Sequence, residues 1–307
     1  MIQRVAIIGL GTMGPGIAAR LARGGLEVCA YDVAPAAIER AGAMLSAAET
    51  VLDALGIART SGGAVRFTDS LADVVSGADL VIENVPENIE MKAEVYRAID
   101  SLIGPETIVA SDTSGIPITS LQAHISHPER MVGMHWSNPP HIVPMIEVIA
   151  GERTAPETVA TIRDLIRALG LLPVLVKKDV PGFVENRVLY ALLREVVDLV
   201  ERGVIEPEDV DTCVSWGIGY KLAVVGPMAL LDMAGMDIYH SVSTFLNTDL
   251  ADRKDVAPLV TKQMAAGKLG IKSGEGIYSY TSERIAELQR ERARKLVAIR
   301  RILEGGE

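Results

Sequence analysis

Residues 4–14 read RVAIIGLGTMG. The first five form a short apolar run that is typical of a buried parallel strand, and apolar residues then recur at helical spacing over residues 13–23. Between these two elements, each glycine has a separate expected role. Gly9 permits a tight turn, Gly11 lets the backbone approach a pyrophosphate, and Gly14 lets helix and strand pack closely. Because the free N–H groups at the start of such a helix bind phosphate, the stretch predicts a dinucleotide site.

A glycine pattern alone is a weak signal, and the next strand strengthens it. An apolar run at residues 28–31 ends in Asp32, 18 positions after Gly14, where a carboxylate binds the hydroxyls of the adenosine ribose. The same carboxylate repels a 2′-phosphate. We therefore expect NAD rather than NADP as the cofactor, with Thr12 and Met13 of the glycine-rich loop also lining its site.

The composition excludes several classes of partner. The chain has 307 residues, of which 30 are basic and 40 acidic, and its formal net charge is −10. This acidic balance argues against nucleic acid or an anionic membrane surface as a partner. The sequence has no secretory signal pattern and no apolar stretch long enough to span a bilayer. Two cysteines suit a reducing compartment, so we expect a cytoplasmic protein without a disulfide framework.

The expected elements alternate between strand and helix up to residue 180. The expected strands cover residues 4–8, 28–31, 65–68, 80–83, 108–110, 130–135, 145–149 and 171–176. The expected helices cover residues 13–23, 35–55, 90–103 and 155–169. Such alternation predicts an α/β fold in which residues 1–180 form a Rossmann-type, doubly wound parallel sheet that binds NAD.

From residue 181 onward only helices are expected. Residues 182–202 carry a wide apolar stripe at helical spacing, which predicts one long helix with a buried face. Further helices are expected at residues 208–216, 228–244, 256–266 and 282–303. The sequence therefore predicts an all-helical second domain over residues 181–307.

Polar side chains lie at the ends of the later strands, and in open parallel sheets the active site usually lies at the carboxyl ends of the strands. His135 ends one expected strand, and Glu147 lies in the next. Hydride transfer from an alcohol or a hydrated aldehyde requires a base of near-neutral pKa, and a carboxylate on its second ring nitrogen fixes the tautomer. We expect His135 to be this base and Glu147 its partner, with no metal ion. Asn138 and Ser114 are expected to donate to the substrate oxygen or to hold the nicotinamide amide. A hydrogen-bonded core histidine is the alternative for His135.

Motifs in both expected domains recur together in one known family. They are GLGTMG at residues 9–14, ENVPEN at 83–88, Thr113-Ser114, His135 with Asn138-Pro139, Glu147, GFVENR at 182–187 and KSGEG at 272–276. On these motifs the whole chain resembles the 3-hydroxyacyl-CoA dehydrogenase family. The resemblance implies that His135 and Glu147 are the catalytic pair. It also implies that Ser114, Asn138 and Asn186 contact the substrate or the nicotinamide, with Ser114 and Asn186 assisting catalysis.

The same resemblance implies that Glu87, Lys92 and Lys272 line the cofactor cleft, and that the second domain supplies a homodimer interface. Other interpretations stay open for the two lysines. Lys92 lies on an expected helix and could be solvated, and Lys272 lies in a glycine-rich turn where a lysine is usually exposed. Asn186 is expected on the buried first turn of the long helix, where an uncompensated amide is costly.

Two segments depart from the acyl-CoA members of the family. Residues 136–141 read WSNPPH, whereas acyl-CoA enzymes usually carry two aromatic residues before the asparagine and one proline after it. Residues 219–227 read GYKLAVVGP, where those enzymes tend to have a shorter, uncharged link. Both features resemble the branch that acts on small polar acids, which includes L-gulonate and carnitine dehydrogenases. In such a site Lys221 could pair with a substrate carboxylate, or it could be an exposed loop lysine.

Within that branch, similarity to enzymes of vitamin B6 degradation implies a small anionic aromatic substrate, a pyridine carboxylate whose aldehyde is oxidised with NAD. No cysteine is placed for covalent aldehyde oxidation, but a hydrated aldehyde is a geminal diol from which His135 can remove a proton. Three alternatives stay open. The substrate could be an L-3-hydroxyacyl-CoA or another small hydroxy acid of the gulonate or carnitine type, or the chain could be a structural or sensor protein that binds NAD(H). The intact set of polar residues around His135 argues against the last.

Overall fold

The computed structural model describes residues 2–305. The chain divides into two compact units, Met1–Asn186 and Arg187–Glu307. The sequence predicted a domain boundary between residues 180 and 181. In the structure, residues 181–186 also belong to the first unit.

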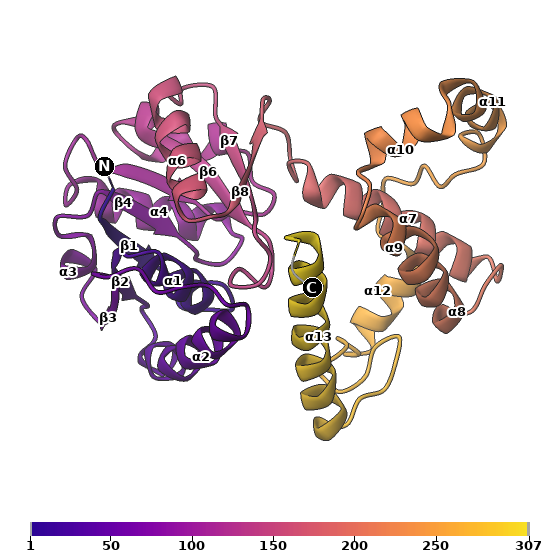
Figure 1. Cartoon of the computed structure of the whole chain (residues 1–307), viewed down its shortest axis with the longest axis horizontal. Helices are drawn as coiled ribbons and strands as arrows, with labels where there is room; N and C mark the ends of the chain where they lie inside the picture. Colours follow the sequence, from indigo (N-terminus) through magenta and orange to yellow (C-terminus); the bar gives the residue numbers. More distant parts are fainter. Residues whose placement is uncertain (1, 306–307) are drawn as a thin grey trace. The chain divides into compact units, whose positions relative to one another are not determined.

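The first unit is built on one eight-stranded sheet with helices on both of its faces (Figure 1). The strand order is β3-β2-β1-β4-β5-β6-β7-β8. The winding direction reverses between β1 and β4, and open sheets bind their ligands at such a switch point. This topology confirms the Rossmann-type fold. The strands are β1 (Arg4–Ile8), β2 (Glu27–Tyr31), β3 (Ala64–Thr68), β4 (Leu80–Glu83), β5 (Ile108–Ser111), β6 (Met131–Trp136), β7 (Met145–Ala150) and β8 (Leu172–Val176).

The expectation of a parallel sheet is wrong for its last two strands. β7 runs antiparallel to β6, and β8 runs parallel to β7, so both run against the first six strands. The reason is the short connection at residues 137–144, because a parallel neighbour requires a crossover of about a dozen residues or more. As a result, His135 of β6 lies directly opposite Glu147 of β7 in the strand register.

Two hydrophobic clusters hold the helices to the two faces of this sheet. Ile17 and Ile166 belong to one cluster, while Tyr96 and Leu121 belong to the other, and all four are fully buried. Burying an aliphatic side chain of this size stabilises the fold by about 1.5–3 kcal/mol. The helices of the first face are α1 (Gly14–Arg23), α2 (Pro35–Ala54) and α6 (Pro156–Ala168), and those of the second are α3 (Leu71–Val75), α4 (Ile89–Asp100) and α5 (Ile118–Leu121).

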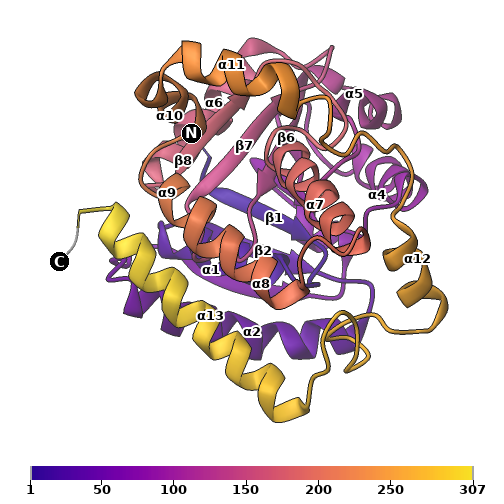
Figure 2. The same cartoon turned by 90° about the vertical axis from the view of Figure 1, so that its right-hand side faces the viewer.

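The second unit consists of helices joined by loops, as expected (Figure 2). One expected helix, at residues 228–244, is instead two, because the chain breaks at Gly235, whose φ of 97° lies outside the helical region. The helices are α8 (Pro207–Thr212), a π-helical segment (Cys213–Gly219), α9 (Tyr220–Leu222), α10 (Pro227–Ala234), α11 (Met236–Leu246), α12 (Pro258–Ala265) and α13 (Ser282–Leu303).

The long helix α7 (Glu185–Glu201) begins at the end of the first unit and continues into the second. It starts three residues later than expected, because Gly182 and Phe183 have positive φ angles of 77° and 49°. The prediction that α7 has a buried apolar face is wrong for the single chain. No residue of α7 is buried, and Val188 is 64% exposed.

Among residues 2–305, no single helix is long and apolar enough to cross a membrane. Only the bent pair Pro207–Leu222 and Pro227–Ala234 meets the criteria of length and composition, and its two parts are inclined at 87°.

Candidate active site

The glycine-rich loop between β1 and α1 has the conformation that its sequence predicted. Gly9 has a φ of 106°, and a Cβ atom there would lie 2.6 Å from the carbonyl oxygen of Asn84. A Cβ atom at Gly14 would lie 2.2 Å from the carbonyl oxygen of Gly9. Gly11 is exposed, and an added Cβ atom would meet nothing within 4 Å among the described residues. Gly9 and Gly14 are therefore required by the backbone, whereas Gly11 leaves open space beside the loop.

The start of α1 fits the phosphates of a dinucleotide. The helix begins at Gly14, and the residue before it, Met13, provides no side-chain cap for the first N–H groups. Such groups satisfy their hydrogen bonds with a bound anion. Thr12 is exposed at the same loop. The uncapped start of α1 and the open space beside Gly11 both lie at the switch point of the sheet. These residues therefore fit the phosphates of NAD.

Asp32 lies at the end of β2, where the sequence predicted a ribose contact. One carboxylate oxygen accepts from the backbone N–H of Leu10 at 2.8 Å, and the other accepts from the N–H of Ala34 at 2.9 Å. The two bonds fix the carboxylate beside the glycine-rich loop. Its negative charge there opposes a 2′-phosphate and favours NAD.

Lys92 is buried, so its interpretation as a solvated side chain is wrong. It is 1% exposed, and its ammonium lies 2.7 Å from one carboxylate oxygen of Glu83, which is also fully buried. The other oxygen of Glu83 accepts from the hydroxyls of Tyr96 at 2.6 Å and Ser111 at 2.7 Å. Burial and the Glu83 charge raise the pKa of Tyr96 well above its usual value. A cofactor contact for Lys92 stays a prediction, because its charge is already paired within the domain.

Glu87 orders the loop that carries Ser114. Its carboxylate oxygen accepts from the hydroxyl of Thr113 at 2.7 Å and from the N–H groups of Ser114 and Gly115 at 3.1 and 2.7 Å. The side chain of Ser114 stays exposed. Glu87 therefore positions the loop, and its contact with the cofactor stays a prediction.

His135 and Glu147 form the centre of the site. The Nδ1 atom of His135 lies 2.8 Å from a carboxylate oxygen of Glu147, and both residues are buried. The second oxygen of Glu147 accepts from the backbone N–H groups of Val184 and Glu185 at 2.9 and 3.1 Å. The fully buried ring of Phe183 packs beside the imidazole, with the ring centres 5.9 Å apart.

These contacts move the pKa values of both partners toward the charged pair. Burial alone lowers the pKa of His135, but the hydrogen bond to Glu147 and the charges of Asp112, Glu147 and Glu185 outweigh it and raise the pKa. Burial raises the pKa of Glu147, but its bonds to His135 and to the two backbone N–H groups lower it overall. Glu147 therefore stays ionised, and His135 can accept and hold a proton.

Two acidic residues without a predicted role also lie near His135. Asp112 accepts from the backbone N–H of Trp136 at 2.7 Å, and burial of its carboxyl group raises its pKa to about 8. Glu185 accepts from the hydroxyl of Ser137 at 2.6 Å. One atom each of His135, Glu147 and Glu185 lie within 4.8 Å of one another. Glu185 lies within the GFVENR motif and Asp112 directly precedes Thr113-Ser114, so an acidic residue within or beside a family motif was the available signal.

Asn186 joins the Ser114 loop to the turn that holds Glu147. Its side-chain amide donates to the carbonyl of Ser114 at 2.8 Å, and the N–H of Gly182 donates to the carbonyl of Gly115 at 3.2 Å. Asn186 is only half-buried, which differs from the expected buried first turn. Ser114, Asn186, Glu147 and His135 thus belong to one connected network.

The remaining predicted residues are exposed. Asn138 follows β6 and precedes a cis peptide bond to Pro139. Lys221 and Lys272 lie in the second unit, Lys221 within the short helix α9 and Lys272 in a turn next to the bridge between Gly270 and Glu275. Lys221 is therefore not a loop lysine. The roles of these three residues stay predictions.

Comparison with known proteins agrees with this geometry. Residues 4–180 match 3-hydroxyacyl-CoA dehydrogenase, NAD binding domain, and residues 182–280 match 3-hydroxyacyl-CoA dehydrogenase, C-terminal domain. The chain is 79% identical over 309 aligned positions, covering 100% of both chains, to 5-formyl-3-hydroxy-2-methylpyridine 4-carboxylate 5-dehydrogenase of Mesorhizobium japonicum.

Solved structures show the same relationship. A crystal structure of 5-formyl-3-hydroxy-2-methylpyridine 4-carboxylic acid 5-dehydrogenase, described as an NAD+ dependent dismutase, has a TM-score of 0.99 and 79% identity over 100% of both chains. The (S)-3-hydroxybutyryl-CoA dehydrogenase PaaH1 of Ralstonia eutropha has a TM-score of 0.74 and 35% identity, with 92% of this chain and 100% of that chain covered. This chain belongs to the 3-hydroxyacyl-CoA dehydrogenase family, whose first domain binds NAD.

Proposed function

We propose that this chain oxidises 5-formyl-3-hydroxy-2-methylpyridine-4-carboxylate, as its hydrate, to 3-hydroxy-2-methylpyridine-4,5-dicarboxylate with NAD, a step of vitamin B6 degradation. The observation that carries the proposal is the buried pair of His135 and Glu147, with 2.8 Å between Nδ1 and the carboxylate. The identity of 79% over the whole chain to a dehydrogenase of that pyridine aldehyde supports the substrate.

His135 acts as the general base. Its Nδ1 atom is engaged by Glu147, so the other ring nitrogen is the one that takes the hydroxyl proton of the substrate. The Glu147 carboxylate, held by two backbone N–H groups, keeps the ring oriented and stabilises the imidazolium that forms. Bound beside the glycine-rich loop and Asp32, NAD would supply the hydride acceptor for this reaction.

Ser114, Asn138 and Asn186 orient the reacting groups. The Ser114 hydroxyl is exposed on a loop that Glu87 and Asn186 hold in place, and it can donate to the substrate oxygen. Asn138 is exposed directly after β6, two residues beyond the end of the strand that carries His135. Its amide can donate to substrate or to the nicotinamide amide. Both donors suit an alkoxide-like oxygen that gains charge as the hydride leaves.

The reaction can run as a dismutation, as the description of the related crystal structure indicates for that enzyme. In the oxidising half, a geminal diol loses a hydride and a proton and becomes a carboxylic acid. In the reducing half, a second aldehyde molecule gains a hydride and a proton and becomes an alcohol. His135 serves both halves, because the proton that it takes in the first can be given back in the second.

The substrate is small and anionic, and we propose that Lys221 pairs with its carboxylate. The support for this contact is the resemblance of residues 219–227 to the branch that acts on small polar acids, and the exposure of the Lys221 side chain. Such an ion pair exists before and during hydride transfer. Lys221 would therefore contribute to binding more than to turnover.

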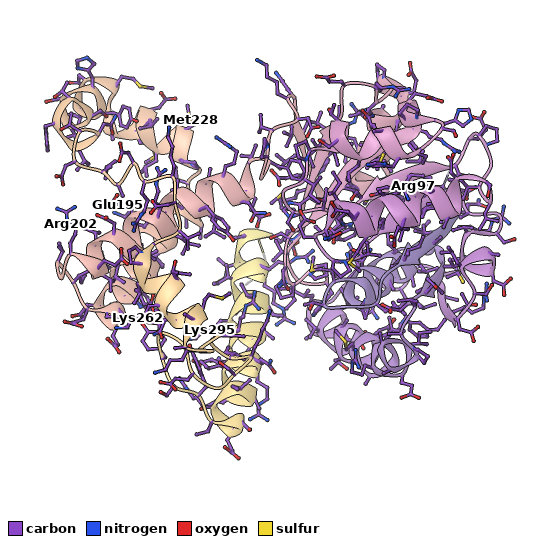
Figure 3. All side chains as sticks on the ribbon, turned by 180° about the vertical axis from the view of Figure 1, so that it is seen from behind. Arg97, Glu195, Arg202, Met228, Lys262 and Lys295 are labelled. Atoms are coloured by element: carbon purple, nitrogen blue, oxygen red, sulfur yellow. The ribbon has the colours of Figure 1, made fainter. Side chains whose placement is uncertain are left out.

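We also propose that the chain works as a cytoplasmic homodimer assembled through its second unit. Exposed apolar side chains on this unit support the proposal, among them Val188 of α7 and Met228 of α10, which is 71% exposed and is labelled in Figure 3. Apolar surface of this kind is usual at interfaces between subunits. The two cysteines, Cys29 and Cys213, are free thiols, as a reducing compartment allows.

A substrate panel tests the proposal. Each candidate would be incubated with NAD and the protein, and its products quantified by liquid chromatography: the pyridine aldehyde, L-3-hydroxybutyryl-CoA, L-gulonate and L-carnitine. We expect NAD-dependent turnover of the pyridine aldehyde and little with the others. Turnover of the acyl-CoA alone would assign the chain to the acyl-CoA branch, and binding of NAD without turnover of any substrate would favour a structural or sensor role.

A further inference from the structure

Glu185 is a second acidic residue at the catalytic histidine that the base mechanism does not use. It is the first residue of α7, and its backbone N–H donates to Glu147. Its carboxylate accepts from Ser137 at 2.6 Å through one oxygen. The other oxygen is buried and accepts no hydrogen bond from any residue in the range 2–305. A carboxylate oxygen in this position lacks the compensation that buried charge requires.

The compensating charge available to it is His135. One atom each of His135, Glu147 and Glu185 lie within 4.8 Å of one another, so two carboxylates from two different elements face a single imidazole. With His135 neutral the three groups carry a net charge of −2, and with His135 protonated they carry −1. At separations of about 4–6 Å, each carboxylate favours the protonated ring.

Other ionisable groups also lie near His135. Asp112 comes from the loop after β5 and also raises the pKa of His135, while burial raises the pKa of its own carboxyl group to about 8. Lys92 and Glu83, which both influence the Asp112 carboxyl group, form an ion pair with each other. Phe183, the remaining neighbour of the ring, carries no charge. Asp112, Glu147 and Glu185 therefore all favour the protonated ring, and Glu185 differs from Asp112 in having a buried oxygen without a hydrogen bond among residues 2–305.

An excess of negative charge has opposite consequences for the two halves of the reaction. The oxidising half begins with neutral His135, which must accept a proton. The reducing half begins with protonated His135, which must donate one. The hydrogen bond from Glu147 already fixes the orientation of the His135 ring. A second carboxylate nearby therefore acts mainly by stabilising the protonated form of the ring.

We propose that Glu185 is a positioning residue that biases His135 toward its protonated form and so favours the reducing half of the dismutation. The inference rests on the proposed function for its reducing half, whereas the coupling of Glu185 to His135 is a property of the protein without substrate.

The experiment measures His135 directly in the full-length protein. The five histidines would be labelled with 13C at Cε1 and titrated by NMR without substrate, and His135 would be identified by its missing signal in His135→Asn. In the unmodified protein His135 should titrate above the ordinary value of about 6.5. In Glu185→Gln, which keeps an acceptor for Ser137, its pKa should fall by about 1–2 units.

Matched variants separate charge from structure. Glu152→Gln removes the same charge from an exposed site of the first unit and should leave the His135 titration unchanged. Glu185→Asp keeps the charge and should retain most of the elevation. Thermal unfolding of each variant would show that the fold is intact.

The two half-reactions give the functional readout. With NADH and the pyridine aldehyde, the alkaline fall of the reduction rate should move to lower pH in Glu185→Gln by the same 1–2 units. With NAD, the acidic limb of oxidation should move in the same direction.

A His135 pKa that is ordinary in the unmodified protein, or unchanged in Glu185→Gln, would overturn the proposal. A lowered pKa with no turnover of the pyridine aldehyde would contradict the proposed function instead, while supporting the coupling of Glu185 to His135.

Discussion

Replacing Glu147 with glutamine tests how much of the catalysis depends on the charge behind His135. Glu147 is 1% exposed and accepts three hydrogen bonds, from the His135 ring at 2.8 Å and from the N–H groups of Val184 and Glu185 at 2.9 and 3.1 Å. Glutamine has only one oxygen in place of the two carboxylate oxygens. Its NH2 group would therefore point either at the His135 ring or at the N–H groups of Val184 and Glu185. The variant therefore keeps the shape of the side chain but loses both the charge and at least one bond.

The magnitude follows from the loss of the charged hydrogen bond to His135. A hydrogen bond to a charged group contributes about 1.5–3 kcal/mol, and each 1.4 kcal/mol corresponds to about a tenfold change in rate. We therefore expect the kcat of aldehyde oxidation to fall about 10- to 100-fold. His135→Ala should cost more, about 10²–10⁴-fold, because the proton acceptor itself is removed.

The pH dependence gives a second readout of the same variant. The bond to Glu147 raises the pKa of His135, so in Glu147→Gln the ring loses its proton at lower pH. The acidic limb of kcat/KM for oxidation should therefore shift to lower pH, and the deficit should be largest on the alkaline side. The initial rate of dicarboxylate formation with NAD from pH 5.5 to 9.5, followed by liquid chromatography, would measure both effects. An unchanged kcat with an unchanged pH profile would refute the role of Glu147.

Three further variants test the cofactor site, the buried ion pair and the substrate contact. Asp32→Ala should reduce the preference for NAD over NADP, measured as the ratio of dissociation constants by fluorescence titration, and equal affinity for both cofactors in the unmodified protein would contradict the assignment. Lys92→Met leaves Glu83 buried without its cation and should lower the free energy of unfolding by about 3 kcal/mol, with partial recovery in the double variant that also carries Glu83→Gln. Denaturant melts would measure this, and a fully stable single variant would contradict it. Lys221→Met should raise KM for the pyridine aldehyde more than it lowers kcat, whereas a change in kcat alone would exclude a ground-state contact.

The parts of the fold that local pattern determines could be predicted from the sequence. The strand, the glycine-rich turn and Asp32 follow one another within about thirty residues, so their periodicity and turn chemistry predict the dinucleotide site. The short link at residues 137–144 also carried a signal for the antiparallel β7, which the expectation of a uniform parallel sheet overlooked. With that link recognised, the pairing of His135 with Glu147 follows from the register of a hairpin.

Contacts between distant segments could not be predicted. Ser137 and Glu185 are 48 positions apart, and only the positive φ angles at residues 182 and 183 turn the chain so that Glu185 meets Ser137. For Lys92 a local signal existed, because it lies one helical turn before Tyr96 and shares its buried face. The burial of its charge depends on Glu83 of β4, which no local pattern reveals.

The most direct test of the central claim is an analysis of products with limiting NAD. The purified protein would be incubated with the pyridine aldehyde and a small amount of NAD, and the acid and alcohol products would be quantified by liquid chromatography. We predict that the dicarboxylate forms in excess of the NAD supplied, with an equal amount of alcohol, and that His135→Ala forms far less of both in the same time. Efficient NAD-dependent turnover of a 3-hydroxyacyl-CoA, with no product from the pyridine aldehyde, would contradict it.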